Sequence, residues 1–148
     1  MTEGNAEFFG FETDAPVPIS LAVRAGDFVL VSGISDHYFG RDSAVYDELG
    51  EMIEDGGGAQ HRSIGEQTRG TLEELRRILS RAGCTLDDVV DMIVWLKEPL
   101  DFWGFNEVYE EFFVNTRPTR AVLRNDFMFV TRIEIKATAY RPLDPGRS

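Results

Sequence analysis

The most regular pattern of apolar and polar positions lies near the end of the chain, in Ile133–Tyr140. Apolar residues alternate there with charged or hydroxyl-bearing ones, which is the period of a strand that buries one face. Val89–Leu96 is apolar at nearly every position, a pattern typical of a strand covered on both faces. Near the start of the chain, Ile19–Arg24 and Phe28–Gly33 predict a hairpin, because Gly26 between them tolerates the positive φ of a tight turn.

Two further stretches predict amphipathic helices. Ser63 opens the capping box Ser-Ile-Gly-Glu, and the helix that follows is expected to run to Ala82 and to end at Gly83. Asp101 is expected to cap the second helix, Phe102–Phe113. In each helix, large apolar residues recur every three or four positions, so one stripe of the helix faces a core.

An extended run that begins at Arg120 completes the pattern. The expected order is strand, strand, helix, strand, helix, strand, strand, which predicts an α+β domain with two helices on one face of a single sheet. The 148 residues suffice for one such core and not for two, so we expect a single domain over residues 1–148. No third helix is expected on the other face of the sheet, so we expect other subunits to bury it.

Two segments lack a clear period. Residues 1–18 carry an aromatic cluster, Phe8, Phe9 and Phe11, before a proline-rich turn. We expect a short edge strand or arm there, whose rings pack on the core. Residues 35–62 include three consecutive glycines and predict an extended loop inserted into the domain. Long loops in compact domains often act as lids or partner contacts and are otherwise simply mobile.

The charge and the cysteine content narrow the classes of function. A net charge of −11 and a pI near 4.6 argue against nucleic acid or an anionic membrane as partner, since both require a basic surface. The acidity belongs to residues 1–60, with 12 acidic and 2 basic side chains, whereas residues 61–148 have 14 and 13. Cys84 is the only cysteine, which excludes a disulfide within the chain and fits a reducing cytoplasm. With two separated histidines, His37 and His61, no metal cluster is recognisable, and we expect neither a cofactor nor a membrane span.

Two charges, Arg120 and Glu134, fall in segments that should otherwise be buried strands. Turn-prone residues at 124–126 predict that these strands pair as a hairpin, with Arg120 and Glu134 near one strand end. An arginine can grip a carboxylate through two hydrogen bonds, and a nearby glutamate can accept or donate a proton. The pair therefore suits a small acid that needs proton transfer. The alternative is a cross-strand ion pair on a solvated sheet, which contributes little to stability.

Three other polar or flexible positions are candidates for the same site. Ser32 and Gly33 end a predicted strand, where a hydroxyl and a backbone N–H can meet a ligand, although Ser-Gly is also ordinary turn chemistry. Asn106 lies off the buried stripe of the second helix, so it faces either a cleft or solvent.

Between about Pro18 and Pro142, six short motifs follow one another in the chain. They are Ala25–Gly33, Glu66-Gln-Thr-Arg69, Ala82-Gly83, Phe102–Phe113 with its Asn106 and Tyr109, Pro118-Thr-Arg120, and Ile133–Ala137. Together they resemble the Rid/YjgF family of reactive-intermediate deaminases. No single motif would suffice, but the set in this order is specific.

The resemblance implies a chorismate-mutase-like fold with a mixed sheet, assembled as a homotrimer with ligand sites in the clefts between subunits. It also implies hydrolysis of enamine or imine carboxylic acids to keto acids and ammonia, without metal or cofactor. Arg120 matches an arginine that grips the substrate carboxylate, and Glu134 matches a glutamate that positions and activates water. Ser32 and Asn106 match positions in or beside the pocket.

The chain departs from this family pattern at three positions. Ile19 stands where typical members have a tyrosine, Val122 where they have a cysteine, and Ile34 where they have a glutamine. The first two changes remove a phenol and a thiol from the expected pocket, which suggests a larger or more apolar substrate. A relative of the 2-aminomuconate deaminases and a non-catalytic, trimeric small-acid binding protein therefore remain alternatives. Ribonuclease activity, attached to some family members, fits the acidic charge least.

Overall fold

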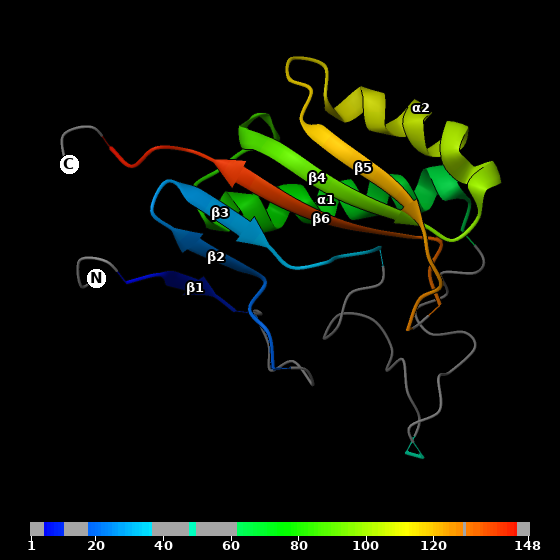
Figure 1. The fold of residues 1–148 in the computed structure, drawn as a ribbon, viewed down its shortest axis with the longest axis horizontal. Coiled ribbons are helices and arrows are strands. Elements are labelled where there is room, and N and C mark those ends of the chain that lie inside the picture. The colour runs from blue at the N-terminus through cyan, green and yellow to red at the C-terminus, as the bar shows by residue number, and fades with distance from the viewer. Residues whose placement is uncertain (1–4, 11–17, 37–47, 50–61, 129, 145–148) are drawn as a thin grey trace.

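A six-stranded sheet with two helices on one face forms the centre of the molecule (Figure 1). The computed structural model describes residues 5–10, 18–36, 48–49, 62–128 and 130–144. One hydrophobic core joins the helices to the sheet. No helix in these ranges is long and apolar enough to cross a membrane.

The strands are arranged in the order β1-β2-β3-β6-β4-β5. They are β1 (Glu7–Phe9), β2 (Ala22–Ala25), β3 (Phe28–Val31), β4 (Val89–Leu96), β5 (Thr119–Arg124) and β6 (Ile133–Tyr140). All neighbouring pairs are antiparallel except β4 and β5, which are parallel. The sheet is therefore mixed, and the predicted α+β class with two helices on one face is confirmed. The hairpin of β2 and β3 turns at Gly26, whose φ is 61°, as its sequence predicts.

The predicted hairpin between the strands of Arg120 and Glu134 is wrong. β4 lies between them, with Met92 opposite Arg120 and Trp95 opposite Glu134. The physical reason is the connection through the second helix, which returns the chain parallel to β4 on one side. β6 then pairs with the other edge of β4. Alternation along a strand shows which face a residue occupies, but not which strand lies beside it.

Helix α1 (Ile64–Arg81) begins and ends where its sequence predicts. The Ser63 hydroxyl oxygen accepts a hydrogen bond from the backbone N–H of Glu66, at 3.1 Å. Gly83 follows the helix with a φ of 79°, a conformation that favours glycine. The apolar stripe of α1, which includes Leu72 and Leu75, is fully buried. A short 3₁₀ helix, η2 (Leu86–Asp88), then leads into β4.

Helix α2 (Phe102–Phe112) follows a second 3₁₀ helix, η3 (Pro99–Asp101). The side chain of Asp101 makes no capping hydrogen bond, so the predicted cap is wrong. Its carboxylate instead accepts a hydrogen bond from Nε of Arg132, at 3.0 Å, and forms an ion pair with the same guanidinium. A two-pronged bond to arginine is stronger than a bond to one backbone N–H, and it fixes the start of β6.

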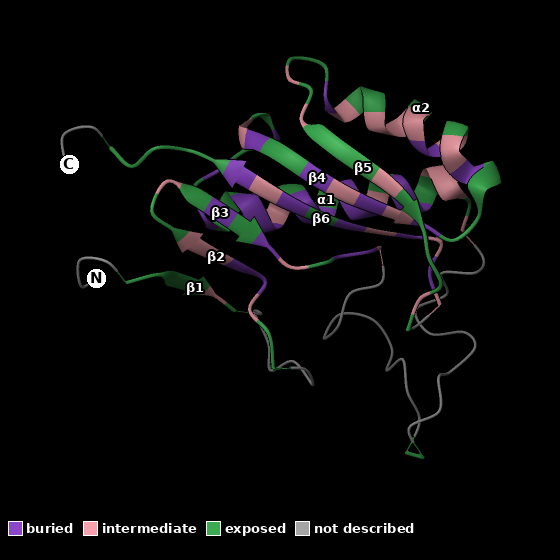
Figure 2. Cartoon of the chain, in the orientation of Figure 1, coloured by how far each residue is buried: buried purple, intermediate pink, exposed green. Residues whose placement is uncertain are grey.

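The two faces of the sheet differ in cover. Along β6, the apolar residues from Ile133 to Ala139 are buried, whereas the residues between them are half-buried or exposed (Figure 2). β4 also alternates, with Trp95 only half-buried, so the expected cover on both faces is wrong for the single chain. We call the uncovered side the open face. Its residues include Phe28, Leu30, Ile93, Trp95, Leu123, Glu134, Lys136, Thr138 and Tyr140.

The segments without clear periodicity are described only in part. Phe8 of β1 is 68% exposed, so its expected packing in the core is wrong, whereas Phe9 packs partly against the core. Phe11 lies outside the described residues. The expected loop insertion over residues 35–62 also lies almost entirely outside them, and it stays a prediction.

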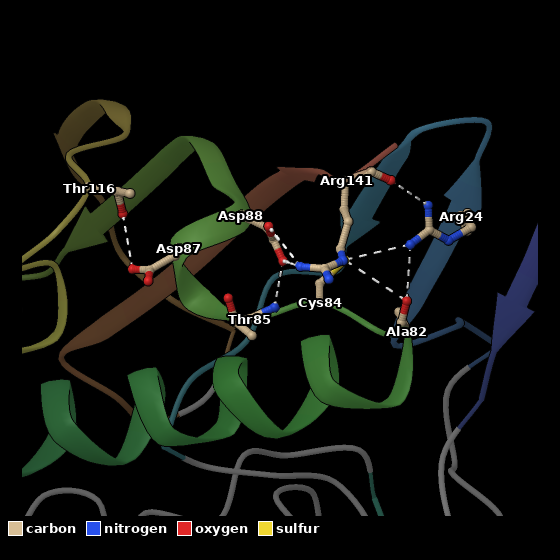
Figure 3. A network of polar contacts seen from close by, with 8 residues as sticks. All are labelled: Arg24, Ala82, Cys84, Thr85, Asp87, Asp88, Thr116 and Arg141. Carbon is tan, nitrogen blue, oxygen red and sulfur yellow. Dashed lines mark hydrogen bonds and ion pairs between the residues drawn. The ribbon is translucent and has the colours of Figure 1, made fainter. Parts of the chain in front are cut away.

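A polar network ties the end of α1 to the sheet (Figure 3). Arg24 of β2 donates hydrogen bonds to the carbonyl oxygens of Ala82 and Arg141, both at 3.1 Å. Arg141 in turn forms an ion pair with Asp88 at 3.3 Å. Cys84 is buried beside this network, and burial raises the pKa of its thiol. A thiol that holds its proton is a poor nucleophile, so Cys84 is a core residue.

Candidate functional site

Arg120 lies on the edge strand β5 and faces α2. Its Nη2 donates a hydrogen bond to Oδ1 of Asn106, at 2.7 Å. The centre of its guanidinium group is 4.7 Å from the ring centre of Tyr109 and 5.3 Å from that of Phe105, close enough for cation–π attraction. The cation is thus oriented by α2. A guanidinium has five N–H donors, so most of them remain for a ligand.

A cavity of about 530 Å³ opens beside this arginine, between α2 and β5. Its volume is within the range of small-molecule sites. The lining combines aromatic rings with a few polar groups: Phe102, Trp103, Tyr109 and Phe113, with Asn106, Glu110, Arg117 and Arg120. The cavity can therefore hold a small anion against an apolar wall.

The hydroxyl of Tyr109 is an unused polar group at this cavity. It is buried and forms no hydrogen bond of standard geometry with the described residues, although the Arg120 guanidinium lies beside it. Burial raises the pKa of Tyr109, although the charge of Arg120 opposes the shift. At neutral pH the phenol therefore keeps its proton and can donate it in a hydrogen bond to a bound acid.

Glu134 is half-buried on the open face, away from this cavity. Burial raises its pKa above the ordinary value of 4.5, and no described residue donates a hydrogen bond to its carboxylate. Gly33 lies against it, because a Cβ at position 33 would be 2.9 Å from Oε2 of Glu134. The lack of a side chain at Gly33 thus leaves room for this carboxyl group, which burial makes more ready to hold a proton than an exposed glutamate.

The other candidates from the sequence are Ser32, Ile19 and Val122. The hydroxyl of Ser32 donates to the carbonyl oxygen of Ser20 at 2.6 Å, so its proton is engaged and its oxygen can still accept. Ile19 is 48% exposed, next to that Ser20. Val122 is half-buried against the core and does not line the cavity.

The structure divides the predicted site into two halves. Arg120 and Asn106 lie together on the helix side, and Glu134 and Gly33 lie together on the open face. Arg120 is opposite Met92, which is buried under the helices, whereas Glu134 is opposite Trp95, three residues further along β4. One small ligand cannot reach both side chains of a single chain, because the sheet lies between them.

The cavity residues that sequence reasoning missed include Trp103, Arg117 and Tyr109 with its hydroxyl. Tyr109 belongs to the apolar stripe of α2, which conceals its polar end. Trp103 is 77% exposed, and its position outside the stripe was a usable signal. Arg117 lies just before Pro118 and Arg120, where a second cation close to the predicted carboxylate anchor was visible.

A second cavity, of about 540 Å³, lies along α1. Its charged residues form ion pairs with each other, Arg76 with Glu73 and Arg77 with Glu74. None of the predicted site residues lines it. Within the described ranges, no group of three or more His, Cys, Asp or Glu side chains is placed to hold a metal ion.

The amino-acid sequence of this chain is similar to those of several known proteins. Residues 12–141 match a family described as Endoribonuclease L-PSP. A RutC family protein of Pyrococcus horikoshii is 35% identical over 135 residues, which cover 88% of this chain and 95% of the relative. The 3-aminoacrylate deaminase RutC of Acinetobacter baylyi is 34% identical over 103 residues, 70% of each chain.

Solved structures of similar proteins share the fold of this chain. A Thermotoga maritima protein superposes with a TM-score of 0.67 at 31% identity, covering 87% of this chain and 91% of its own. A YjgF family member from Neisseria meningitidis has a TM-score of 0.71 at 21% identity, with 97% and 100% covered, and supports the fold alone. The chain therefore belongs to the Rid/YjgF family.

Proposed function

We propose that this protein hydrolyses small enamine or imine carboxylic acids to the keto acid and ammonia. The observation that carries the proposal is the Arg120 guanidinium, oriented by Asn106 at 2.7 Å beside a cavity of about 530 Å³. Membership of a family that includes a 3-aminoacrylate deaminase supports the same chemistry. The half-buried Glu134, with its raised pKa, supplies a group for proton transfer.

The reaction needs positioning and proton transfer more than a nucleophilic side chain. Arg120 holds the substrate carboxylate, and an enamine first takes a proton on carbon to become the imine. Glu134 directs a water molecule to the imine carbon and accepts its proton, while the nitrogen is protonated. The C–N bond of the resulting amino alcohol then breaks, ammonia leaves with the electron pair, and the oxygen loses its proton to form the ketone.

We propose further that each site forms between two copies of the chain in a homotrimer. Arg120 and Glu134 of one chain lie on opposite sides of the sheet, so a second copy has to supply one of them. The open face offers a contact surface, since Leu30, Leu123 and Tyr140 are exposed to 42%, 49% and 41%. Large apolar residues exposed on one face of a sheet commonly mark an interface.

Mixing two inactive variants tests the shared site directly. Arg120→Ala and Glu134→Gln trimers are each expected to lose activity. After unfolding and refolding together, each mixed trimer should regain one intact site, so activity returns to about a quarter of the wild-type value. The measurement is ammonia release above the spontaneous rate from freshly generated 2-aminoacrylate or 2-iminobutyrate. The matched control is each variant refolded alone.

Two outcomes would contradict the proposal. No recovery in mixed trimers of confirmed composition would place the whole site within one chain. No wild-type activity with any imino acid, together with tight binding of keto acids, would favour the non-catalytic binding protein. That second candidate is favoured by Ile19, which replaces the family tyrosine and is 48% exposed.

A further inference from the structure

We infer that the cavity between α2 and β5 selects acids with a second anionic group, and that Arg117 recognises this group. The inference rests on the proposed function, in which Arg120 holds the reacting end of the substrate. It assigns the far end of the substrate to the other arginine of the same cavity. The substrate class is then a short dicarboxylic enamine or imine rather than a simple monoacid.

The spacing of the two arginines suits such a ligand. Arg117 and Arg120 are three residues apart and both line the cavity of about 530 Å³. Three extended peptide units span at most about 10 Å, and Pro118 between the arginines restricts the backbone. Two long side chains on this short segment can therefore hold the two carboxylates of one small diacid.

Arg117 makes no polar contact within the described part of the fold. Its side chain is exposed and forms no hydrogen bond or ion pair with any described residue. Arginines elsewhere in the described part of the chain commonly pair with carboxylates, as Arg69 does with Glu111. Glu110 lines the same cavity, yet no ion pair joins it to Arg117 or Arg120. The two cations are thus free to bind an anion.

The apolar wall of the cavity favours a ligand longer than the smallest imino acids. Trp103 packs edge-on against Phe102, with ring centres 5.1 Å apart, and is 77% exposed. Tyr109 adds a buried hydroxyl beside Arg120 that forms no hydrogen bond of standard geometry with the described residues. A monoacid held by Arg120 would leave the second cation of the cavity, Arg117, without an anion. A diacid would lie along this wall and occupy both cations.

The test compares two stable keto acids of similar length, which are product analogues. 2-Oxoglutarate has a second carboxylate, whereas 2-oxohexanoate has an uncharged tail. Calorimetry on the assembled protein measures their affinities in wild type, Arg117→Gln and Arg124→Gln. Arg124 is the matched control, because it is an exposed arginine of β5 that does not line the cavity. Circular dichroism checks that each variant is folded.

Arg117→Gln should weaken 2-oxoglutarate about tenfold, the scale of one charge-assisted hydrogen bond, and change 2-oxohexanoate by less than about twofold. Arg124→Gln should change neither acid. Equal weakening of both acids, or of neither, in Arg117→Gln would overturn the inference. Arg120→Lys, which should weaken both acids, separates this failure from that of the proposed site. If wild type bound neither acid, the inference would fall together with the proposed site.

Discussion

The two halves of the predicted site are prepared for different tasks. Around Arg120, the cation is already oriented by Asn106 and by aromatic rings at the surface of α2. Around Glu134, the carboxyl group is half-buried with no donor among the described residues, and Gly33 only makes room for it. In the proposed function, the first region binds an anion and the second exchanges a proton.

This difference indicates that the half of the site around Glu134 is the incomplete one. A preorganised cation loses little entropy when it binds a carboxylate, so the Arg120 half should bind ligand without further change. A half-buried carboxyl without partners is a costly arrangement in a single chain. The proposed assembly would account for it, because a second copy would cover the open face and bring its own Arg120 to Glu134.

The largest effect is expected from a charge placed on the open face. Leu30 is 42% exposed there, and Leu30→Asp would bury an unpaired carboxylate in the proposed interface, which is costly. We expect a folded monomer without deaminase activity, measured by light scattering and by ammonia release. The control is Leu100→Asp, because Leu100 is 95% exposed in η3, away from the sheet. Assembly retained in Leu30→Asp would remove the open face from the interface.

The next effect concerns turnover. Glu134→Gln keeps the shape of the side chain but loses the exchangeable proton, so kcat should fall by about 10²–10⁴. Keto acid affinity and assembly should stay unchanged, because Arg120 supplies the binding. Steady-state kinetics with an imino acid and calorimetry with its keto acid measure the two separately. Glu98→Gln, an exposed glutamate before η3, is the control, and a loss of affinity equal to the loss of kcat would contradict this division of tasks.

A smaller effect is expected at the other half. Arg120→Lys keeps the charge but loses the planar pair of donors, so carboxylate affinity should fall by about 1.5–3 kcal/mol while the assembly stays folded. Arg124→Lys, on the same strand and outside the cavity, should bind normally. Calorimetry on the confirmed assembly is the measurement. Unchanged affinity in Arg120→Lys would mean that Arg120 does not bind the carboxylate.

The local elements of this fold could be predicted from the sequence, because the responsible signals lie within a few residues. The alternation in Ile133–Tyr140 and the apolar run Val89–Leu96 coincide with β6 and β4. The hydroxyl cap of Ser63 and the glycine at position 83 mark the ends of α1, although the Glu66 carboxylate does not complete the predicted capping box. Each of these signals depends only on residues that are close together in the sequence.

The neighbours of each strand could not be predicted in the same way. Arg120 and Glu134 were expected on adjacent strands, but β4 lies between them. The decision depends on the crossover through α2 and on core packing, which involve residues far apart in the chain. Asp101 shows the same limit, since its partner is Arg132 rather than the adjacent helix. The pairing of β4 with β5 and β6, which divides the site into two halves, is therefore the feature hardest to predict from the sequence.

The smallest effect concerns stability, and it compares Glu134 in a separated chain with Glu134 in the assembly. Burial raises the pKa of Glu134 in the single chain. Below the ordinary pKa of 4.5, the group is protonated in the folded and unfolded states alike. As pH rises through the raised pKa, the unfolded chain ionises first, so folding loses stability. A glutamine at position 134 does not titrate, so the Glu134→Gln variant does not lose this stability as pH rises.

In the Leu30→Asp background, Glu134→Gln should therefore be the more stable protein at neutral pH, with no such gain near pH 4.5. The gain should be modest, because water screens a half-exposed carboxyl. In the assembly, Arg120 of a second copy would favour the ionised form, so the gain should shrink or reverse. Urea unfolding at fixed protein concentration, at both pH values and in both backgrounds, measures the difference. An equal gain in monomer and assembly would mean that no cation approaches Glu134 and that the two halves of the site do not meet.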